Sequence, residues 1–324
     1  MAGGSHPPGA PDYSIAGVLR LLSSPAGAII LALGEGPLRT RRLVERVQRA
    51  QGVAPRTIYR HLEALEAFGL VSRTEEPGAV PSRVTYRLSR PAGCHLNHLV
   101  QAFAGAAPSG GPERQLESRE WERLALLAEL MEQGIVDALS CEQLSPTELA
   151  RRLPALSLHQ IGRRANLFSA AGLLRERRGA GRNKRYELTN LTRRHMALVA
   201  ALIRWRRRHV DDRGAGAETA IALRVALPLV RLPEQIGKLV AFAVLAEDGD
   251  EVTFWARVER QGLISCGKGA AAGADGQVRG TSATWLAALL DGKRGKFQVG
   301  GCGTLVDAYL KGLHQRLSDD GRGR

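Results

Sequence analysis

The chain has 324 residues, which is too long for one small module and short for more than three domains. It contains 46 basic and 32 acidic residues, a formal net charge of +14, and 44% of its residues are hydrophobic. That hydrophobic content excludes a fully disordered chain. No apolar run approaches the roughly 20 residues of a spanning helix, which excludes a membrane-embedded protein. This positive charge indicates a polyanionic partner, most commonly nucleic acid. The alternative is that the charge reflects an arginine-rich proteome.

Most of the positive charge lies in the first two thirds of the chain. Residues 1–110 carry a net charge of +5, residues 111–214 carry +7 and residues 215–324 carry only +2. Gly-rich breaks separate the three parts, and the first residues lack the apolar segment of a signal peptide. The sequence therefore predicts a disordered tail at 1–12, domains at 13–108, 113–212 and 217–318, and a short tail at 319–324.

The cysteines and the motif search argue against a metal centre or an enzyme. Cys94, Cys141, Cys266 and Cys302 are scattered, without Cys-x-x-Cys or Cys/His ligand spacing. The sequence therefore predicts neither a disulfide scaffold nor a zinc site. It predicts a protein of the reducing cytoplasm. The motifs of serine hydrolases, phosphate-binding loops, dinucleotide-binding folds and zinc peptidases are absent. The sequence thus predicts no enzyme, no cofactor and no metal.

An internal repeat organises the first two thirds of the chain. Residues 28–33 recur at 134–139, residues 69–71 (Gly-Leu-Val) at 172–174 (Gly-Leu-Leu), and residues 86–88 (Tyr-Arg-Leu) at 186–188 (Tyr-Glu-Leu). The offset falls from 106 to 103 to 100, as expected if one loop and one hairpin are each three residues shorter in the second copy. We call the two stretches the first and second copy.

The periodicity of each copy predicts three helices, a two-stranded hairpin and a further helix. In the first copy, helices are expected over 25–34, 38–50 and 55–68, ended by Gly69, and strands over 70–74 and 83–88. In the second copy, helices are expected over 144–153 and, capped by Ser157, 158–171, with strands over 173–178 and 185–188. Long helices over 115–140 and 191–210 pack either the two copies or two protomers together.

The third helix and hairpin of the first copy resemble those of bacterial winged helix-turn-helix regulators. Residues 56–71 read Arg-Thr-Ile-Tyr-Arg-His-Leu-Glu-Ala-Leu-Glu-Ala-Phe-Gly-Leu-Val, and Tyr86-Arg-Leu88 follows. This is similar to the helix ending Leu-x-x-Leu-x-x-x-Gly-Leu-Val and the wing of the HxlR, MarR and PadR families. The resemblance covers about 25–103 and, more loosely, 130–205, where Ala165 and Phe168 replace the usual leucines. It implies two tandem winged helices and a double-stranded DNA partner.

Helix geometry then predicts which side chains face DNA. The stripe Ile58, Leu62 and Leu65 faces the core and leaves Arg56, Thr57, Arg60 and Glu63 on the outside. Arginine can pair with guanine, and glutamine or asparagine with adenine. Basic wing residues can follow the phosphate backbone. The residues predicted to contact DNA are Arg39, Arg41, Arg56, Thr57, Arg60, His61 and Arg83 in the first copy, and His159, Gln160, Arg163, Arg164, Asn166, Arg178, Arg182, Asn183, Lys184 and Arg185 in the second.

The last third of the chain is expected to form a different, α+β domain. Strands are predicted over 238–246, 251–259, 263–267, 277–280 and 296–300, with helices over 281–292 and 305–317. This order resembles the sterol-carrier-protein-like fold, which implies an apolar cavity for a lipid-like small molecule. The cavity candidates, for which plain core packing is the alternative, are Phe242, Phe254, Trp255, Trp285, Leu289 and Phe297.

The sequence therefore predicts an α+β protein with two tandem winged helices and a small C-terminal domain of a sheet and two helices. Its expected function is sequence-specific transcriptional regulation at the nucleoid, with the C-terminal domain sensing an apolar small molecule or assembling a homodimer. Because the reading residues of the two copies differ, one chain is expected to act as a pseudo-dimer on a bipartite, non-palindromic site. The alternative is an architectural scaffold that binds DNA nonspecifically or binds another protein.

Overall fold

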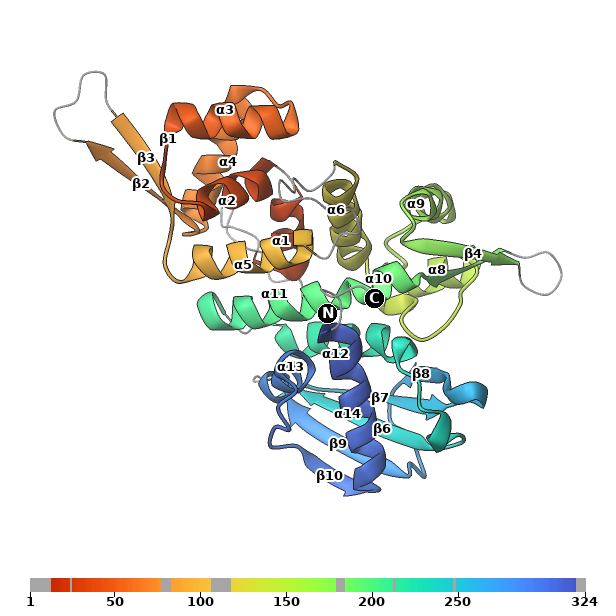
Figure 1. The fold of residues 1–324 in the computed structure, drawn as a ribbon. Coiled ribbons are helices and arrows are strands. Elements are labelled where there is room, and N and C mark those ends of the chain that lie inside the picture. Colours follow the sequence, from red (N-terminus) through yellow and green to blue (C-terminus); the bar gives the residue numbers. More distant parts are fainter. Residues whose placement is uncertain are drawn as a thin grey trace. The chain divides into compact units, whose positions relative to one another are not determined.

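The computed structural model describes residues 13–23, 25–76, 83–105, 118–178, 184–211, 214–246 and 249–318. The chain forms two compact units, Met1–Ala128 and Glu129–Arg324 (Figure 1). The predicted tails and the tips of both predicted wings, which include Arg182 and Asn183, lie outside the described residues.

The first unit contains the first copy of the repeat. Its elements are α1 (Ile15–Leu22), α2 (Pro25–Gly34), β1 (Leu38–Arg39), α3 (Thr40–Gln51), α4 (Pro55–Ala67), β2 (Val71–Glu76), β3 (Arg83–Leu88), α5 (Ala92–Gly105) and most of α6 (Ser118–Glu132). The strands form one antiparallel sheet in the order β1-β3-β2. Ile29 of α2, Leu43 of α3 and Ile58 of α4 are fully buried in its core. The predicted helices at 25–34 and 55–68 and the hairpin are confirmed to within two residues.

The helix predicted over 38–50 begins two residues late. Leu38 and Arg39 are extended and pair with Tyr86 and Thr85 of β3. The hydroxyl of Thr40 donates to the carbonyl of Val84 at 3.1 Å, which holds the first helical residue against the hairpin. Leu38 and Arg39 are therefore part of a third strand of the sheet and not of the helix.

No single helix in the described part of the chain is both long and apolar enough to cross a membrane. Only α1 and α2 pass that test, when the two helices are counted together although they are bent by 75°.

The second unit contains the second copy. Its elements after α6 are α7 (Ile135–Ala138), α8 (Pro146–Arg152), α9 (Leu158–Ala170), β4 (Leu174–Arg178), β5 (Lys184–Leu188), α10 (Asn190–Arg194) and α11 (Met196–His209). The helix predicted over 115–140 is interrupted at Gly134, whose φ of 71° lies in the left-handed region. The helix predicted over 191–210 is likewise divided, at His195.

The two copies share backbone contacts at the offsets that the sequence gives. Each third helix ends before a glycine with positive φ, Gly69 at 65° and Gly172 at 76°, because that conformation suits a residue without a side chain. Matching hydrogen bonds run from Leu70 N to Leu65 O and from Leu173 N to Phe168 O, both 2.9 Å, and from Ser89 N to Leu70 O and from Thr189 N to Leu173 O, at 2.9 and 3.1 Å. Matching antiparallel pairs join Leu38 to Tyr86 and Leu144 to Tyr186.

The rest of the second unit is a five-stranded sheet with helices on one face. Its elements are α12 (Ala215–Ala226), short 3₁₀ turns η2 (Leu227–Leu229), η3 (Pro233–Gln235) and η4 (Arg260–Gly262), β6 (Leu239–Leu245), β7 (Glu251–Val258), β8 (Ile264–Lys268), β9 (Gly276–Thr281), α13 (Ser282–Asp291), β10 (Gln298–Gly301) and α14 (Gly303–Ser318). The strand order is β10-β9-β6-β7-β8, with β6 and β9 parallel and the other pairs antiparallel. The predicted strands and the two predicted helices are confirmed.

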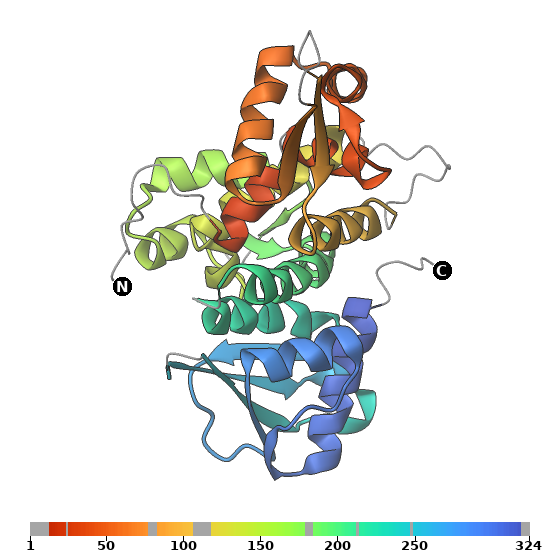
Figure 2. The same cartoon turned by 90° about the vertical axis from the view of Figure 1, so that its left-hand side faces the viewer.

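Helix α12, which the sequence did not predict, lies between α11 and the sheet (Figures 1 and 2). Its residues are buried almost all round, so it lacks the polar stripe by which an amphipathic helix is recognised. A buried ion pair ties it to α11, where Arg206, 4% exposed, contacts Glu218 at 2.6 Å. The second copy and the C-terminal sheet therefore belong to one compact unit.

Candidate nucleic-acid interface

The third helix of the first copy, α4, exposes a basic face. Ile58, Leu62 and Leu65 are at most 1% exposed and fix which side of the helix faces the core. Arg56 and Arg60 therefore project from the opposite side into solvent, close to the N-terminal end of the helix. Pro55 occupies the first turn, where its missing N–H is not needed for an intrahelical hydrogen bond. The predicted outward face of this helix is thus the one that the structure exposes.

The other residues predicted to contact DNA in the first copy differ in their exposure and in their ion pairs. Thr57 and His61 are half-buried, and burial together with the neighbouring Arg60 lowers the pKa of His61. Arg41 is exposed and pairs with Glu45 at 2.9 Å, while Arg83 of β3 lies 3.7 Å from Glu76.

Arg39 of β1 lies at a groove of about 440 Å³ between the start of α3 and the hairpin. Its lining residues are Pro37, Leu38, Arg39, Arg42 and Thr85. Arg42 is exposed and belongs to the same basic run as Arg39 and Arg41, which the sequence predicts to lie near the DNA backbone.

The third helix of the second copy, α9, is fixed by a reciprocal cap. The Ser157 hydroxyl accepts from the Gln160 amide N–H at 3.2 Å, and the Gln160 side-chain oxygen accepts from Ser157 N–H at 2.8 Å. The predicted cap at Ser157 is confirmed. The same cap turns the side-chain oxygen of Gln160 toward the backbone N–H of Ser157. The sequence predicts Gln160 to contact a base.

The outward face of α9 carries the remaining predicted residues. His159, Arg163 and Asn166 are exposed, opposite the buried Ile161, Ala165 and Phe168. The structure places Arg164 on a different side, where its guanidinium pairs with Glu129 of α6 at 3.2 Å.

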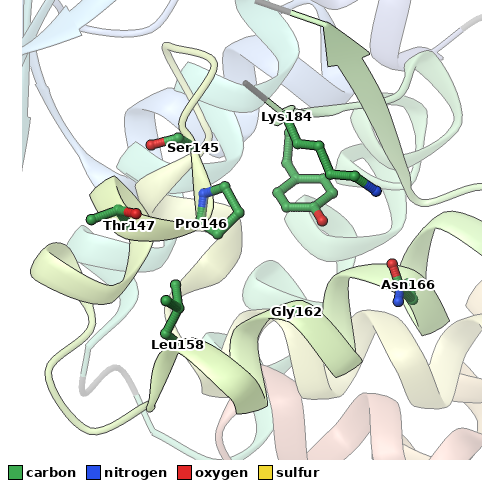
Figure 3. A pocket seen from close by; sticks show the side chains of 8 residues that line it. Ser145, Pro146, Thr147, Leu158, Gly162, Asn166 and Lys184 are labelled. Atoms are coloured by element: carbon green, nitrogen blue, oxygen red, sulfur yellow. The ribbon is translucent and has the colours of Figure 1, made fainter. Parts of the chain in front are cut away.

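An open groove of about 570 Å³ runs between the start of α8, the side of α9 that carries Leu158, Gly162 and Asn166, and strand β5. In Figure 3, Thr147 and Leu158 lie on one side, Lys184 reaches over from β5, and Asn166 follows further along α9. The lining residues are Ser145, Pro146, Thr147, Leu158, Gly162, Asn166, Lys184 and Tyr186. Sequence reasoning missed Ser145 and Thr147, although the pattern Ser145-x-x-Glu148 is the signature of the capping box that starts α8.

The hairpin of the second copy is basic but partly neutralised. Lys184 contacts Glu176 at 3.0 Å, and this ion pair raises the pKa of Lys184. Arg185 donates to the carbonyl of Gln143 at 2.8 Å and contacts Glu148, so it braces β5 against the start of α8. Arg178, at the end of β4, is exposed.

Two further arginines of the same hairpin share one acid. Arg175 and Arg177 both contact the Glu187 carboxylate, at 2.8 and 2.9 Å. Two guanidinium groups against one carboxylate leave this face of the hairpin positive.

The aromatic residues predicted to line a ligand cavity divide between two places. Phe242 stacks on Phe254 with ring centroids 5.0 Å apart, and Trp285 packs against both Phe242 and Phe297. The Trp285 indole N–H donates to Ala243 O at 3.0 Å. Phe242, Phe254, Trp285 and Leu289 are at most 2% exposed and pack between the sheet and its helices, whereas Phe297 is half-buried.

Trp255 does not join them. Neighbouring residues of a strand point to opposite faces of a sheet, so Trp255 lies on the face opposite Phe254. There its ring covers Gly267 of β8, where an added Cβ would sit 2.4 Å from the indole.

Loss of the α9 cap is expected to destabilise the second unit modestly. Ser157→Ala removes the acceptor for the Gln160 N–H and should reduce the free energy of unfolding by about 1 kcal/mol. Urea unfolding followed by circular dichroism measures this change. Ser157→Asp keeps an acceptor at the same place and should restore the midpoint. Equal midpoints for the wild type and the alanine variant would show that the cap contributes nothing.

One protein-family model matches part of this chain. Residues 26–108 match the family model of the HxlR-like helix-turn-helix. The matched range contains α2, α3, α4, the β2–β3 hairpin and α5, whose geometry is described above. The match supports a DNA-binding winged helix-turn-helix regulator for this part of the chain. No curated protein matches the chain.

Proposed function

We propose that this protein is a sequence-specific transcription regulator that binds double-stranded DNA through both copies of the repeat. The observation that carries the proposal is the exposed face of α4, within the part of the chain that matches a helix-turn-helix family. Such a helix lies in the major groove and contacts base edges from its N-terminal half. Arg56, Thr57 and Arg60 occupy that half of α4, and His159 and Arg163 occupy the same half of α9.

Base recognition is proposed for two arginines and one asparagine. Arg60 and Arg163 are exposed and carry the planar fork that pairs with guanine, while Asn166 offers the amide that pairs with adenine. Gln160 is proposed to position α9 rather than to read a base, because its side-chain oxygen already accepts from Ser157 N–H.

Phosphate contact is proposed for the basic residues beside each third helix. Arg39, Arg41 and Arg83 have this role in the first copy, and Arg178 and Lys184 in the second. The pairs Arg41–Glu45 and Lys184–Glu176 are exposed, and such pairs stabilise a protein little, so exchanging a carboxylate for a phosphate costs little. Arg182 and Asn183 are expected to belong to this set.

The two copies are proposed to read different half-sites. The positions that carry Arg56, Thr57 and Arg60 in α4 carry His159, Gln160 and Arg163 in α9. The shared hydrogen bonds that close each third helix onto its hairpin support the view that the second copy is also a winged helix. One chain would then bind a bipartite site without two-fold symmetry.

Charge reversal on α4 tests whether this face meets DNA. Arg56→Glu combined with Arg60→Glu should weaken binding of the full chain to duplex DNA at least tenfold and flatten its dependence on salt, because two negative charges then face the duplex. Fluorescence anisotropy across a salt series measures both quantities.

The matched control combines Arg257→Glu with Arg316→Glu, two exposed arginines of the C-terminal domain, and changes the net charge by the same amount. This control should bind nearly as the wild type does. Equal losses for the two double variants would mean that only overall charge matters and would contradict the proposed interface.

A protein partner is the second candidate, and one observation favours it. Leu158 and Leu167 of α9 are 53% and 52% exposed. Leucines of this kind would suit a scaffold that uses the second copy to bind another protein. Unchanged DNA affinity after Arg163→Glu would favour this candidate for the second copy.

The C-terminal domain is proposed to serve assembly, such as a homodimer, or the sensing of an apolar small molecule. The close packing of Phe242, Phe254 and Trp285 favours assembly, because a ligand would have to displace those rings.

A further inference from the structure

Two cysteines that are distant in the sequence meet inside the second unit. Cys141 lies in the loop between α7 and α8 and is half-buried, whereas Cys266 lies in β8 and is 5% exposed. Ser140, the residue before Cys141, lies against both sulfur atoms, that of Cys141 through its hydroxyl and that of Cys266 through its carbonyl oxygen. The Cys266 sulfur also lies 3.6 Å from the carbonyl oxygen of Arg224 and 3.8 Å from that of Ser140. The Ser140 hydroxyl donates to the Cys141 sulfur at 3.6 Å.

Three basic side chains lie near the two thiols. Arg224, 4% exposed, pairs with Asp137 of α7, and Lys268 of β8 pairs with the same carboxylate at 2.5 Å. Arg193 of α10 donates to the carbonyl oxygen of Val225 at 3.0 Å. Two of these positive charges share the Asp137 carboxylate, and the Arg193 guanidinium lies 3.5 Å from the Ser140 carbonyl oxygen, so the net charge near the thiols is positive, a setting that stabilises a thiolate.

The two thiols are not equivalent in this setting. The hydrogen bond from the Cys266 thiol, with smaller contributions from Ser140, Arg224 and Lys268, lowers the pKa of Cys141. The same hydrogen bond, together with burial, raises the pKa of Cys266. Cys141 is therefore the nucleophile of the pair, and it is also the more accessible of the two.

The cations argue against a metal ion at this place. Among the described residues, no three His, Cys, Asp or Glu side chains are grouped closely enough to hold one. Arg193, Arg224 and Lys268 would also repel a divalent cation, whereas they assist a reaction that passes through a thiolate.

We propose that Cys141 and Cys266 form a peroxide-sensitive dithiol whose oxidation links the α7–α8 loop to strand β8 by a disulfide. The proposal concerns thiol chemistry and stands apart from DNA binding. The oxidant is a hydroperoxide such as hydrogen peroxide.

The reaction balances in two steps. The Cys141 thiolate attacks one peroxide oxygen and the O–O bond breaks, which gives a sulfenic acid and, after protonation, one water molecule. The Cys266 sulfur then attacks the Cys141 sulfur, loses its proton and displaces the hydroxyl group as a second water molecule. Two thiols and one peroxide thus give one disulfide and two waters, and the two sulfur atoms supply the two electrons.

Closure of this bond would displace the loop that precedes α8. A disulfide holds its two sulfur atoms about 2.05 Å apart, so the two cysteines must move together when it forms. Cys141 lies three residues before Leu144, which pairs with Tyr186, and four residues before Ser145, which caps α8. Oxidation therefore acts on the segment that forms one wall of the groove beside α9.

The experiment uses the reduced full-length chain treated with hydrogen peroxide and then alkylated. Two of its four cysteines should become protected from alkylation, and peptide mapping without reductant should show Cys141 linked to Cys266. The melting temperature should rise by about 5–10 °C, because the bridge closes a long loop. Dithiothreitol should reverse both changes.

Variants separate the two steps. Cys141→Ser should abolish the bridge, whereas Cys94→Ser and Cys302→Ser should leave it intact. Cys266→Ala should stop the reaction at a Cys141 sulfenic acid that dimedone traps. The proposal is overturned if the wild-type chain bridges through Cys94 or Cys302, or if Cys141 is oxidised to a sulfinic acid while Cys266 stays free. It is also overturned if both thiols remain fully alkylatable after peroxide.

Discussion

Replacing Arg60 with alanine is expected to relax the base preference of the first copy at one position while DNA binding persists. A bidentate contact between arginine and guanine is worth about 1–3 kcal/mol of discrimination, so roughly 5- to 150-fold of selectivity should be lost there. Arg163→Ala should do the same at a different position, because α9 carries the corresponding residue. Competition binding with duplexes substituted one base pair at a time measures both effects.

Replacing Arg178, which is proposed to contact phosphate, provides the comparison for Arg60→Ala. Arg178→Ala, at the exposed end of β4, should weaken binding to all sequences alike and reduce the salt slope by about 1. If Arg60→Ala also weakened all duplexes uniformly, α4 would contact only the DNA backbone and the assignment of Arg60 to base recognition would be wrong.

Replacing Asp137 with asparagine is expected to be the most destabilising of these changes. Arg224 is 4% exposed and pairs with the Asp137 carboxylate, so the variant leaves a buried guanidinium without its counter-charge. Removing the partner of a fully buried charge costs about 3–5 kcal/mol, and the loss here should lie at or below the lower end of that range because the Asp137 side chain is itself 32% exposed. The second unit should therefore unfold at a clearly lower denaturant concentration, measured by urea titration with circular dichroism.

A surface ion pair provides the matched control. Asp291 contacts Arg204 at 2.5 Å, and both side chains are more than a third exposed. Asp291→Asn should cost less than about 1 kcal/mol, since exposed ion pairs contribute little. Similar losses for Asp137→Asn and Asp291→Asn would mean that burial of Arg224 does not govern the stability of this unit.

The features that sequence could predict are those set by local pattern. Ile58, Leu62 and Leu65 recur at helical spacing, so both the existence of α4 and its outward face followed from the residues alone. Gly69 and Gly172 mark helix ends because they adopt positive φ. The repeat located α9 and the second hairpin from the first copy.

The features that sequence could not predict depend on distant partners. Leu38 and Arg39 form β1 only because β3 pairs with them. Helix α12 has no polar stripe, since the sheet and α11 cover it on two sides. Arg164 was placed with the DNA-facing residues, but Glu129 lies beside it. The neighbouring thiols of Cys141 and Cys266 are separated by 125 residues, and no spacing rule connects them.

Selection of bound sites from random duplex DNA by the full-length wild-type chain tests the central claim most directly. Specific regulators bind their sites about 10³–10⁷ times more tightly than random DNA at physiological salt. We predict that selection yields a bipartite motif with two different half-sites, bound by one chain with a preference of at least about 10³-fold. Recovery of no motif, with equal affinity for selected and scrambled duplexes, would contradict sequence-specific regulation and favour the scaffold. A palindrome bound by two chains would contradict the pseudo-dimer.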